Sequence, residues 1–434
     1  MKPAKATLFT LIPILYFSVS GGPYGLEEIV TAVGPLYSLL LILLVPVLWT
    51  IPECLIVAEL ASTYPVQGGY YKWVQMGLGN LWGFMEGWWS IIYTLIDLSL
   101  YPILFSTYVK IIFPQLDFLS LYLVQLTMIW SCVIMNVLGI KFVGNVLTLL
   151  KSFIVLLFVA FVIIGAKFIS FDFSSTLIVP DDIPLKSLVF GLSLVFWNYI
   201  GFDGGSTVLE EIESPEKNFH RALLTIVPII ALLYFFPILI GVSINPNWET
   251  WHFGEFTHIA NHMNMPFLGL LLAIGGMVTT FGLFNSLILT STRIFSVMSN
   301  DGWLPKAFAK LHSKHNTPYI TIIFAGMVYS FLVLIGFYKL VVYVVFLFLL
   351  AMLLEAITLI ALRKKNPGAK THFKIPFGNF GLWFVVILAS LVILFMSFIH
   401  LSSMDKAGIF ISFLLVFSGI PIYIIGIKLG KEAS

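Results

Sequence analysis

The chain has 434 residues, 59% of them hydrophobic and 10% charged, with a mean hydropathy of +1.01 and a formal net charge of +2. Soluble globular domains average about 25% charged residues, so this composition excludes a water-soluble protein. The small net charge gives no reason to expect nucleic acid as a partner, and we expect the lipid bilayer to be the environment of the chain.

Apolar segments long enough to cross a bilayer recur along the whole chain. A hydrocarbon core of about 30 Å requires about 20 apolar residues per helix. We predict twelve spans, at residues 8–33, 36–62, 80–109, 119–137, 142–166, 186–209, 222–243, 266–298, 318–337, 340–362, 381–400 and 407–428. They predict one all-α integral membrane domain over residues 1–434, without a cleavable leader. Cys54 and Cys132 fall inside spans, which indicates packed thiols and no disulfide.

The first span is interrupted halfway by residues 18–25, which include three glycines and a proline. Proline removes a hydrogen-bond donor, and glycine adds to the entropic cost of a helix. In a bilayer such a break persists only where it is buried in protein or lines a wet cavity. Glu27 and Glu28 follow directly, so the segment predicts an ion or substrate site. The alternative for both acids is that they cap the second half-helix.

The second span carries Glu53 deep in the membrane and Glu59 at its edge. An acidic residue at mid-bilayer raises the free energy of membrane insertion by about 2.5–3.5 kcal/mol. Each such residue is therefore expected to have a structural or functional role. Glu53 is either a proton or amine ligand or a structural hydrogen-bonding group, whereas we expect Glu59 to be structural. Residues 58–72 contain a proline and paired glycines, which predicts a turn-rich connection.

The third span places aromatic and acidic side chains on one helix face. Tyr93, Asp97 and Tyr101 are spaced by four residues. Asp97 is expected to bind a cationic group, and Tyr93 is expected to lie over it. For Trp88 and Trp89 we expect ordinary packing.

The sixth span repeats the interruption of the first. Trp197, Asn198 and Asp203 lie among the glycines of residues 196–206. Two interrupted spans, five spans apart, indicate two inverted five-helix repeats with a binding site at the bilayer midplane. The predicted repeats and the added helices cover residues 8–166, 186–362 and 381–428.

The basic residues are distributed unequally between the two sides of the membrane. With a cytoplasmic N-terminus, 17 Lys and Arg residues fall on the inside and five on the outside. This asymmetry predicts a multi-pass protein of the cell membrane with both termini in the cytoplasm.

The predicted external loop over residues 245–264 contains a histidine pair. His258 and His262 are four residues apart, which is compatible with metal ligation. Because no third ligand is evident, we expect a solvated interfacial helix and no metal.

The sequence lacks the motifs that are typical of nucleotide-binding proteins and of hydrolytic enzymes. The chain contains no phosphate-binding loop, no Gly-x-Ser-x-Gly and no His-Glu-x-x-His motif. A membrane enzyme would need paired catalytic groups, which we do not find, and scattered single acids do not form a continuous channel pore. We therefore expect no enzyme and no cofactor.

Several motifs match a known family over nearly the whole chain. They are Ser20-Gly21-Gly22-Pro23-Tyr24-Gly25-Leu26-Glu27, Ile51-Pro52-Glu53, Ala58-Glu59-Leu60, Trp82-Gly83-Phe84-Met85-Glu86-Gly87, Tyr101-Pro102, Phe196-Trp197-Asn198, Phe202-Asp203 and Ser214-Pro215-Glu216-Lys217. With them the chain resembles the amino acid–polyamine–organocation permeases, and most of all their polyamine–proton uptake branch. Residues 200–202, before Asp203, are more similar to the amino acid carriers of the superfamily.

The resemblance implies a five-plus-five inverted-repeat bundle with substrate between spans 1, 3, 6, 8 and 10. The substrate-binding residues would be Gly21, Gly22, Tyr24, Gly25, Glu27, Tyr93, Asp97, Trp197, Asn198 and Asp203. Asp203 would hold an amine or cap the broken segment. Tyr93 and Trp197 would stack on an alkylammonium by a cation–π interaction.

Lys151, in the fifth span, is implied to take part in proton coupling. Proton-coupled relatives carry a lysine here whose ammonium takes the place of a sodium ion. Its partners would be carbonyl groups of residues 18–21 and the hydroxyl of Thr279, and Glu53 is a second proton-coupling candidate. The alternative is a lysine that extends to the membrane surface.

The sequence thus predicts a secondary transporter that takes up a polyamine or another small cationic amine together with protons. The alternative is an amino acid permease or exchanger, in which the glycine-rich break holds a substrate carboxylate.

Overall fold

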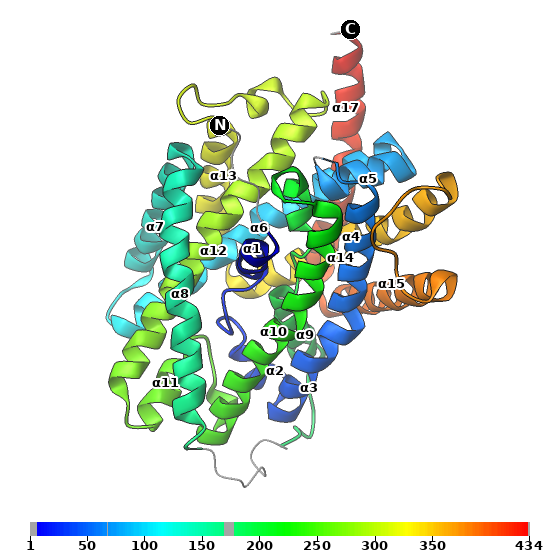
Figure 1. Cartoon of the computed structure of the whole chain (residues 1–434). Helices are drawn as coiled ribbons and strands as arrows, with labels where there is room; N and C mark the ends of the chain where they lie inside the picture. The colour runs from blue at the N-terminus through cyan, green and yellow to red at the C-terminus, as the bar shows by residue number, and fades with distance from the viewer. Residues whose placement is uncertain (1–6, 67, 169–177, 433–434) are drawn as a thin grey trace.

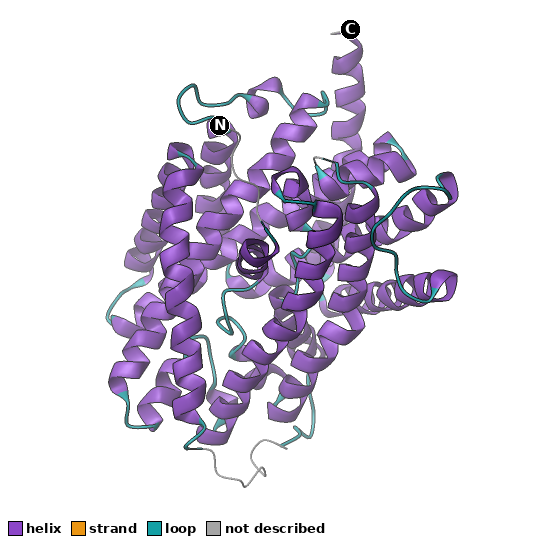
Figure 2. Cartoon of the chain, viewed as in Figure 1, coloured by secondary structure: helices purple, strands orange, loops and turns teal. Residues whose placement is uncertain are grey.

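The computed structural model describes residues 7–66, 68–168 and 178–432, apart from the side chains of residues 9–10, 13–14, 17–18, 140–152, 207–208, 210–211, 289–290 and 428–432. The described residues form helices joined by loops and turns, with no strand among them (Figure 2). This confirms the all-helical class that the apolar spans predict.

The helices follow the predicted spans closely. Their bounds are α1 (Leu8–Val19), α2 (Glu28–Val33), α3 (Pro35–Val45), α4 (Ile51–Thr63), α5 (Gly69–Leu78), α6 (Asn80–Ile112), α7 (Phe118–Leu138), α8 (Ile140–Gly165), α9 (Leu185–Asn198), α10 (Pro215–Ile244), α11 (Glu255–His262), α12 (Pro266–Asn300), α13 (Tyr319–Leu332), α14 (Phe337–Lys365), α15 (Gly378–Ser403), α16 (Lys406–Phe417) and α17 (Gly419–Glu432).

Eight segments within the described residues are long and apolar enough to cross a membrane. Further apolar helices are shorter, among them Leu185–Asn198 and Tyr319–Leu332, because breaks and turns divide the corresponding spans. The chain is therefore a multi-pass membrane protein.

The first span is divided as its glycines and proline predict. Helix α1 ends at Val19 and α2 begins at Glu28, and the segment between them is buried. In Figure 1, α1 lies at the centre of the bundle, viewed nearly along its axis, and the chain then descends to α2.

The sixth span is divided in the same way. Helix α9 ends at Asn198, and the chain resumes as the 3₁₀ helix η2 (Gly204–Glu211). The intervening Gly201 has φ +99°, a left-handed conformation that favours glycine.

Two connections differ from the sequence expectation. Residues 58–63 belong to α4, and the amphipathic helix α5 already begins at Gly69. Of the predicted turn-rich connection, residues 64–66 and 68 are described and lie outside the helices. The tryptophan and tyrosines of α5 are buried against the bundle, which explains why a helix forms there. The second span also contains a π-helical turn, η1 (Pro46–Thr50), because Pro46 and Pro52 supply no N–H for regular bonds.

Helix α6 packs most extensively against α12 and α14. Helix α10 packs against both α1 and α4. Cys54 and Cys132 are buried free thiols, as expected. Trp88 and Trp89 donate to Ser418 Oγ and to the Val416 carbonyl, which confirms their packing role.

Candidate functional site

A small cavity lies where both broken helices meet α6 and α12. Its volume is about 20 Å³, the space of about one water molecule. The lining residues are Val19, Gly21, Tyr24, Tyr101, Leu104, Trp197, Asn198, Thr279, Thr280 and Leu283. The structure thus brings Gly21, Tyr24, Trp197, Asn198 and Thr279 of the predicted set together.

Asp97 is held against the wall of this cavity. Its Oδ1 accepts a hydrogen bond of 2.6 Å from Trp197 Nε1. The Trp197 ring lies 5.7 Å from that of Tyr101, the next residue on the same face of α6. A short bond of this kind fixes both side chains, so a carboxyl group and an indole face form one side of the site.

Gly25 allows the first break to lie close to that indole. Its φ is +88°, and a Cβ at this position would lie 2.9 Å from a Trp197 ring carbon. A larger residue would therefore need both a strained backbone and a displaced tryptophan. The glycine at this point of the break is explained by contact with the second broken helix.

The break hydrogen-bonds to its own side chains. Gly22 N–H donates to Ser20 Oγ at 3.1 Å, and Gly25 N–H donates to Glu27 Oε2 at 2.8 Å. Pro23 has no N–H. The half-helix amides that would suit a substrate carboxylate are therefore partly occupied by the chain itself.

Glu27 ties the break to two other elements. Its Oε1 accepts hydrogen bonds from Tyr108 Oη and from Gly254 N–H, both at 3.2 Å. Together with Gly25 N–H this makes three donors around one buried carboxylate. Glu27 does not line the small cavity, and its contacts resemble those of a structural group.

Tyr234 of α10 joins the two breaks. Its hydroxyl lies 2.7 Å from Ser20 Oγ and 3.0 Å from the carbonyl oxygen of Asn198. Ser20 directly follows the last residue of α1, and Asn198 is the last residue of α9. The side chain thus stabilises both unwound segments at once.

Replacing Tyr234 by Phe is expected to lower the free energy of unfolding by about 1–3 kcal/mol, because buried groups at both breaks lose their partner. Thermal unfolding in detergent measures the effect. Tyr329→Phe is the matched control, since Tyr329 is equally buried but does not bridge the two breaks. An equal fall in the Tm of the two variants would show that the bridge contributes nothing.

Thr279 contacts the first break as expected. Its hydroxyl donates to the Gly21 carbonyl at 3.0 Å. The Lys151 side chain, its expected neighbour, lies outside the described residues. The proton-coupling role of both residues therefore remains a prediction.

A second group of acids lies inside the bundle on α4, α6 and α14 and before η2. Its members are Glu53, Glu86, Asp203 and Glu355, and all four are buried. Neither oxygen of Glu86 and Glu355 has a hydrogen bond among the described residues, and Oδ1 of Asp203 also has none. The Glu355 carboxylate interacts electrostatically with those of the other three. We refer to these four residues as the inner acid cluster.

Tyr93 lies between Asp97 and the inner acid cluster. It is one turn from Asp97 on α6, and it interacts with Asp203, Glu86 and Glu355. Its ring packs edge-on against Phe348 of α14, with centroids 5.5 Å apart. From Asp97 to Glu86 the helix rises about 16 Å, at about 1.5 Å per residue. Acidic groups thus follow α6 over several turns.

A larger cavity of about 450 Å³ lies beside α2, towards the end of the molecule that contains α11. Glu28, Thr31, Lys186, Trp251 and Tyr338 are among its lining residues. Glu28 Oε1 also accepts from Phe253 N–H at 3.4 Å. Glu28 therefore faces this outer cavity and the loop, and not the small cavity.

Glu59 has the structural role that its position predicts. Arg363 of α14 donates to both of its carboxylate oxygens at 2.6 Å, and Ile375 N–H donates at 2.7 Å. This bidentate pair links α4, α14 and the segment before α15.

Sequence reasoning missed Tyr234 and Glu355. Glu355 is the one acid within the apolar residues 340–362, and the cost of an acid at membrane depth was the signal that could have identified it. Tyr234 gives no such signal, because its partners are groups that the breaks make available far away in the chain.

Comparisons with known proteins agree with this architecture. The family model described as "Amino acid permease" matches residues 9–427. The polyamine transporter RMV1 of Arabidopsis thaliana is 32% identical over 379 residues, which cover 87% of this chain and 77% of the relative.

Two further relatives differ in their named substrates. The polyamine transporter PUT1 of Oryza sativa subsp. japonica is 31% identical over 395 residues, covering 87% of this chain and 71% of the relative. The branched-chain amino acid permease BcaP of Bacillus subtilis is 26% identical over 378 residues, covering 80% and 76%. The family match reaches from α1 to α17 and includes both breaks, so the chain belongs to the amino acid permease family and is a membrane transporter, not an enzyme.

Proposed function

We propose that this protein takes up a polyamine or a similar small cationic amine, driven by protons and the membrane potential. The observation that carries the proposal is the buried inner acid cluster, in which Glu86 and Glu355 have no hydrogen-bond partner among the described residues. Like charges buried together repel one another, so a cationic partner or protons must neutralise them.

The first break supports a substrate without a carboxylate. Its Gly22 and Gly25 amides donate to Ser20 and Glu27, which leaves fewer donors for an amino acid carboxylate. Asp97 and the faces of Trp197 and Tyr101 instead suit an ammonium group.

The distribution of acids along α6 supports a molecule with more than one ammonium group. Asp97 would bind one, and the inner acid cluster would bind another. An inside-negative potential contributes about 2.3 kcal/mol per charge for each 100 mV. Because each charge adds this free energy, the membrane potential strongly favours the uptake of a polycation.

The architecture that we propose for this activity comprises twelve transmembrane helices in a single domain. Two inverted five-helix repeats would cover residues 8–166 and 186–362, and helices at 381–428 would lie outside them. Seventeen basic residues on one side against five on the other support cytoplasmic termini in the cell membrane.

Proton coupling would depend on Lys151, Thr279 and Glu53. The contact of the Thr279 hydroxyl with the Gly21 carbonyl supports a role for Thr279 at the first break. Lys151→Ala is expected to abolish the dependence of uptake on a pH gradient while uptake driven by a membrane potential persists. Initial rates in proteoliposomes measured with each gradient alone test this, and an unchanged response to pH would exclude the role.

Uptake of labelled putrescine, spermidine, arginine and leucine into proteoliposomes tests the proposed function. We expect the two polyamines to accumulate when the lumen is negative and the outside is acidic. The branched-chain relative makes amino acid uptake the second candidate. Accumulation of leucine or arginine without that of either polyamine would establish this second candidate and overturn the first.

A further inference from the structure

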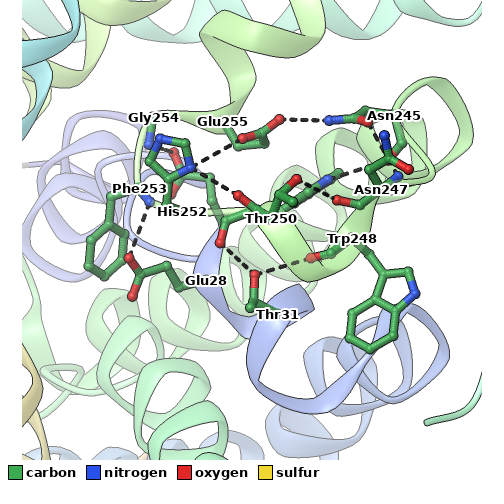
Figure 3. A network of polar contacts seen from close by, with 12 residues as sticks. Glu28, Thr31, Asn245, Asn247, Trp248, Thr250, His252, Phe253, Gly254 and Glu255 are labelled. Atoms are coloured by element: carbon green, nitrogen blue, oxygen red, sulfur yellow. Dashed lines mark hydrogen bonds and ion pairs between the residues drawn. The ribbon is translucent and has the colours of Figure 1, made fainter.

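Three potential metal ligands meet on the loop between α10 and α12. They are His252, Glu255 and His258, and their ligand atoms all lie within 4.8 Å of one another. Figure 3 shows His252 directed towards the Glu255 carboxylate. The sequence draws attention only to His258 and His262 and favours a solvated helix without a metal. In the structure Glu255 and its neighbours on α11 are buried.

Backbone geometry brings the three side chains together. Glu255 and His258 are three residues apart on α11 and share a face. Gly254 has φ +92°, a left-handed conformation that favours glycine, and a Cβ there would displace the Ile111 side chain. The turn is closed by Glu255 N–H donating to the His252 carbonyl at 3.1 Å, which places His252 over the start of the helix.

The central carboxylate is already oriented by a neighbour. Asn245 Nδ2 donates to Glu255 Oε1 at 2.8 Å, while Glu255 Oε2 lies 3.6 Å from His252 Nδ1. Partners that hold a ligand in this manner are typical of metal sites. His252 Nδ1 also lies 3.1 Å from the Thr250 carbonyl, a contact that metal ligation through this nitrogen would replace.

The dimensions suit a tetrahedral ion. Zinc bonds of about 2.1 Å separate neighbouring ligand atoms by about 3.4 Å, close to the 3.6 Å between His252 and Glu255. The exposed His252 can rotate to close the remaining distance.

We propose that His252, Glu255 and His258 bind a divalent cation of the zinc class, with water as the fourth ligand, and that the ion fixes this loop against α2. The loop already contacts α2 and the first break through three hydrogen-bonded groups. Phe253 N–H donates to Glu28, Gly254 N–H donates to Glu27, and Thr31 Oγ1 donates to the Trp251 carbonyl. Under the proposed transport function, an ion that holds these contacts in place would slow uptake from the outside.

Calorimetric titration of Zn²⁺ into the purified, tag-free protein at pH 7.4 tests the site. We expect one bound ion, and affinity lower by at least about tenfold in both His252→Ala and His258→Ala. The exposed His372→Ala is the matched control and should bind as the wild type does. No binding, or equal losses in all three variants, would overturn the site.

A second measurement addresses the effect on transport. External Zn²⁺ is expected to slow substrate uptake in wild-type proteoliposomes and not in those containing His258→Ala. Normal uptake in the presence of bound Zn²⁺ would overturn the fixing of the loop. Because calorimetry requires no transport, failure of the metal site can be distinguished from failure of the proposed function.

Discussion

Asp97→Asn is expected to raise the Km for spermidine uptake by about 10–100-fold. The substitution keeps the shape of the side chain and its contact with Trp197 but removes the charge that would bind an ammonium group. A hydrogen bond to a charged group contributes about 1.5–3 kcal/mol, and each 1.4 kcal/mol is about tenfold in affinity. Initial uptake rates in proteoliposomes over a range of spermidine concentrations measure the change.

The matched control for this prediction is Asp182→Asn. It makes the same chemical change at an exposed residue outside the helices. We expect its Km to equal that of the wild type. If Asp97→Asn also leaves Km unchanged, the ammonium does not bind at Asp97, and the assignment of the cavity as a cation site is wrong.

Glu355→Gln is expected to weaken spermidine binding by about tenfold while changing putrescine binding by less than about threefold. The longer polyamine would reach the inner acid cluster from Asp97, and the shorter one would not. The substitution also removes one of four repelling buried acids, so the Tm of the substrate-free protein should rise or stay constant.

Equilibrium binding of both polyamines to the purified variant measures this difference. Glu249→Gln, at an exposed glutamate of the loop, is the matched control and should bind both as the wild type does. Equal losses for spermidine and putrescine would contradict a subsite at the inner acid cluster. A changed pH dependence with unchanged affinities would instead assign Glu355 to proton coupling.

The two breaks could be predicted because their cause is local. Glycine and proline act on the backbone at their own positions, and a membrane gives no solvent to satisfy the groups that they free. The residue types in segments 18–25 and 196–206 are therefore sufficient to predict that each helix is interrupted there. The neighbours of each break could not be derived in this way, since the contact of Gly25 with Trp197 depends on how the helices pack.

The acids were visible in the sequence, but their environments were not. Glu27 and Asp97 are both acids at membrane depth, yet three donors surround Glu27 whereas Asp97 pairs with an indole beside the cavity. The difference arises from Tyr108 and Gly254, which are distant in the chain. Spacing along one helix contains no information about such partners.

In the loop over residues 245–264, helical periodicity alone does not predict which side chains meet. Helical spacing shows that His258 and His262 share a face of the helix, four residues apart, and indicates no third ligand. The left-handed Gly254 instead folds His252 back over the helix start, so the group forms with Glu255. A turn residue outside the helix decides which side chains meet.

The central claim is that carboxylates inside this bundle bind a polycation. Calorimetric titration of spermidine and of leucine into the purified protein, without any gradient, tests it most directly. We expect spermidine to bind and leucine not to bind, and we expect the double variant Asp97→Asn/Glu355→Gln to lose spermidine binding while remaining folded. Binding of leucine but not spermidine, or full spermidine affinity in the double variant, would contradict the claim.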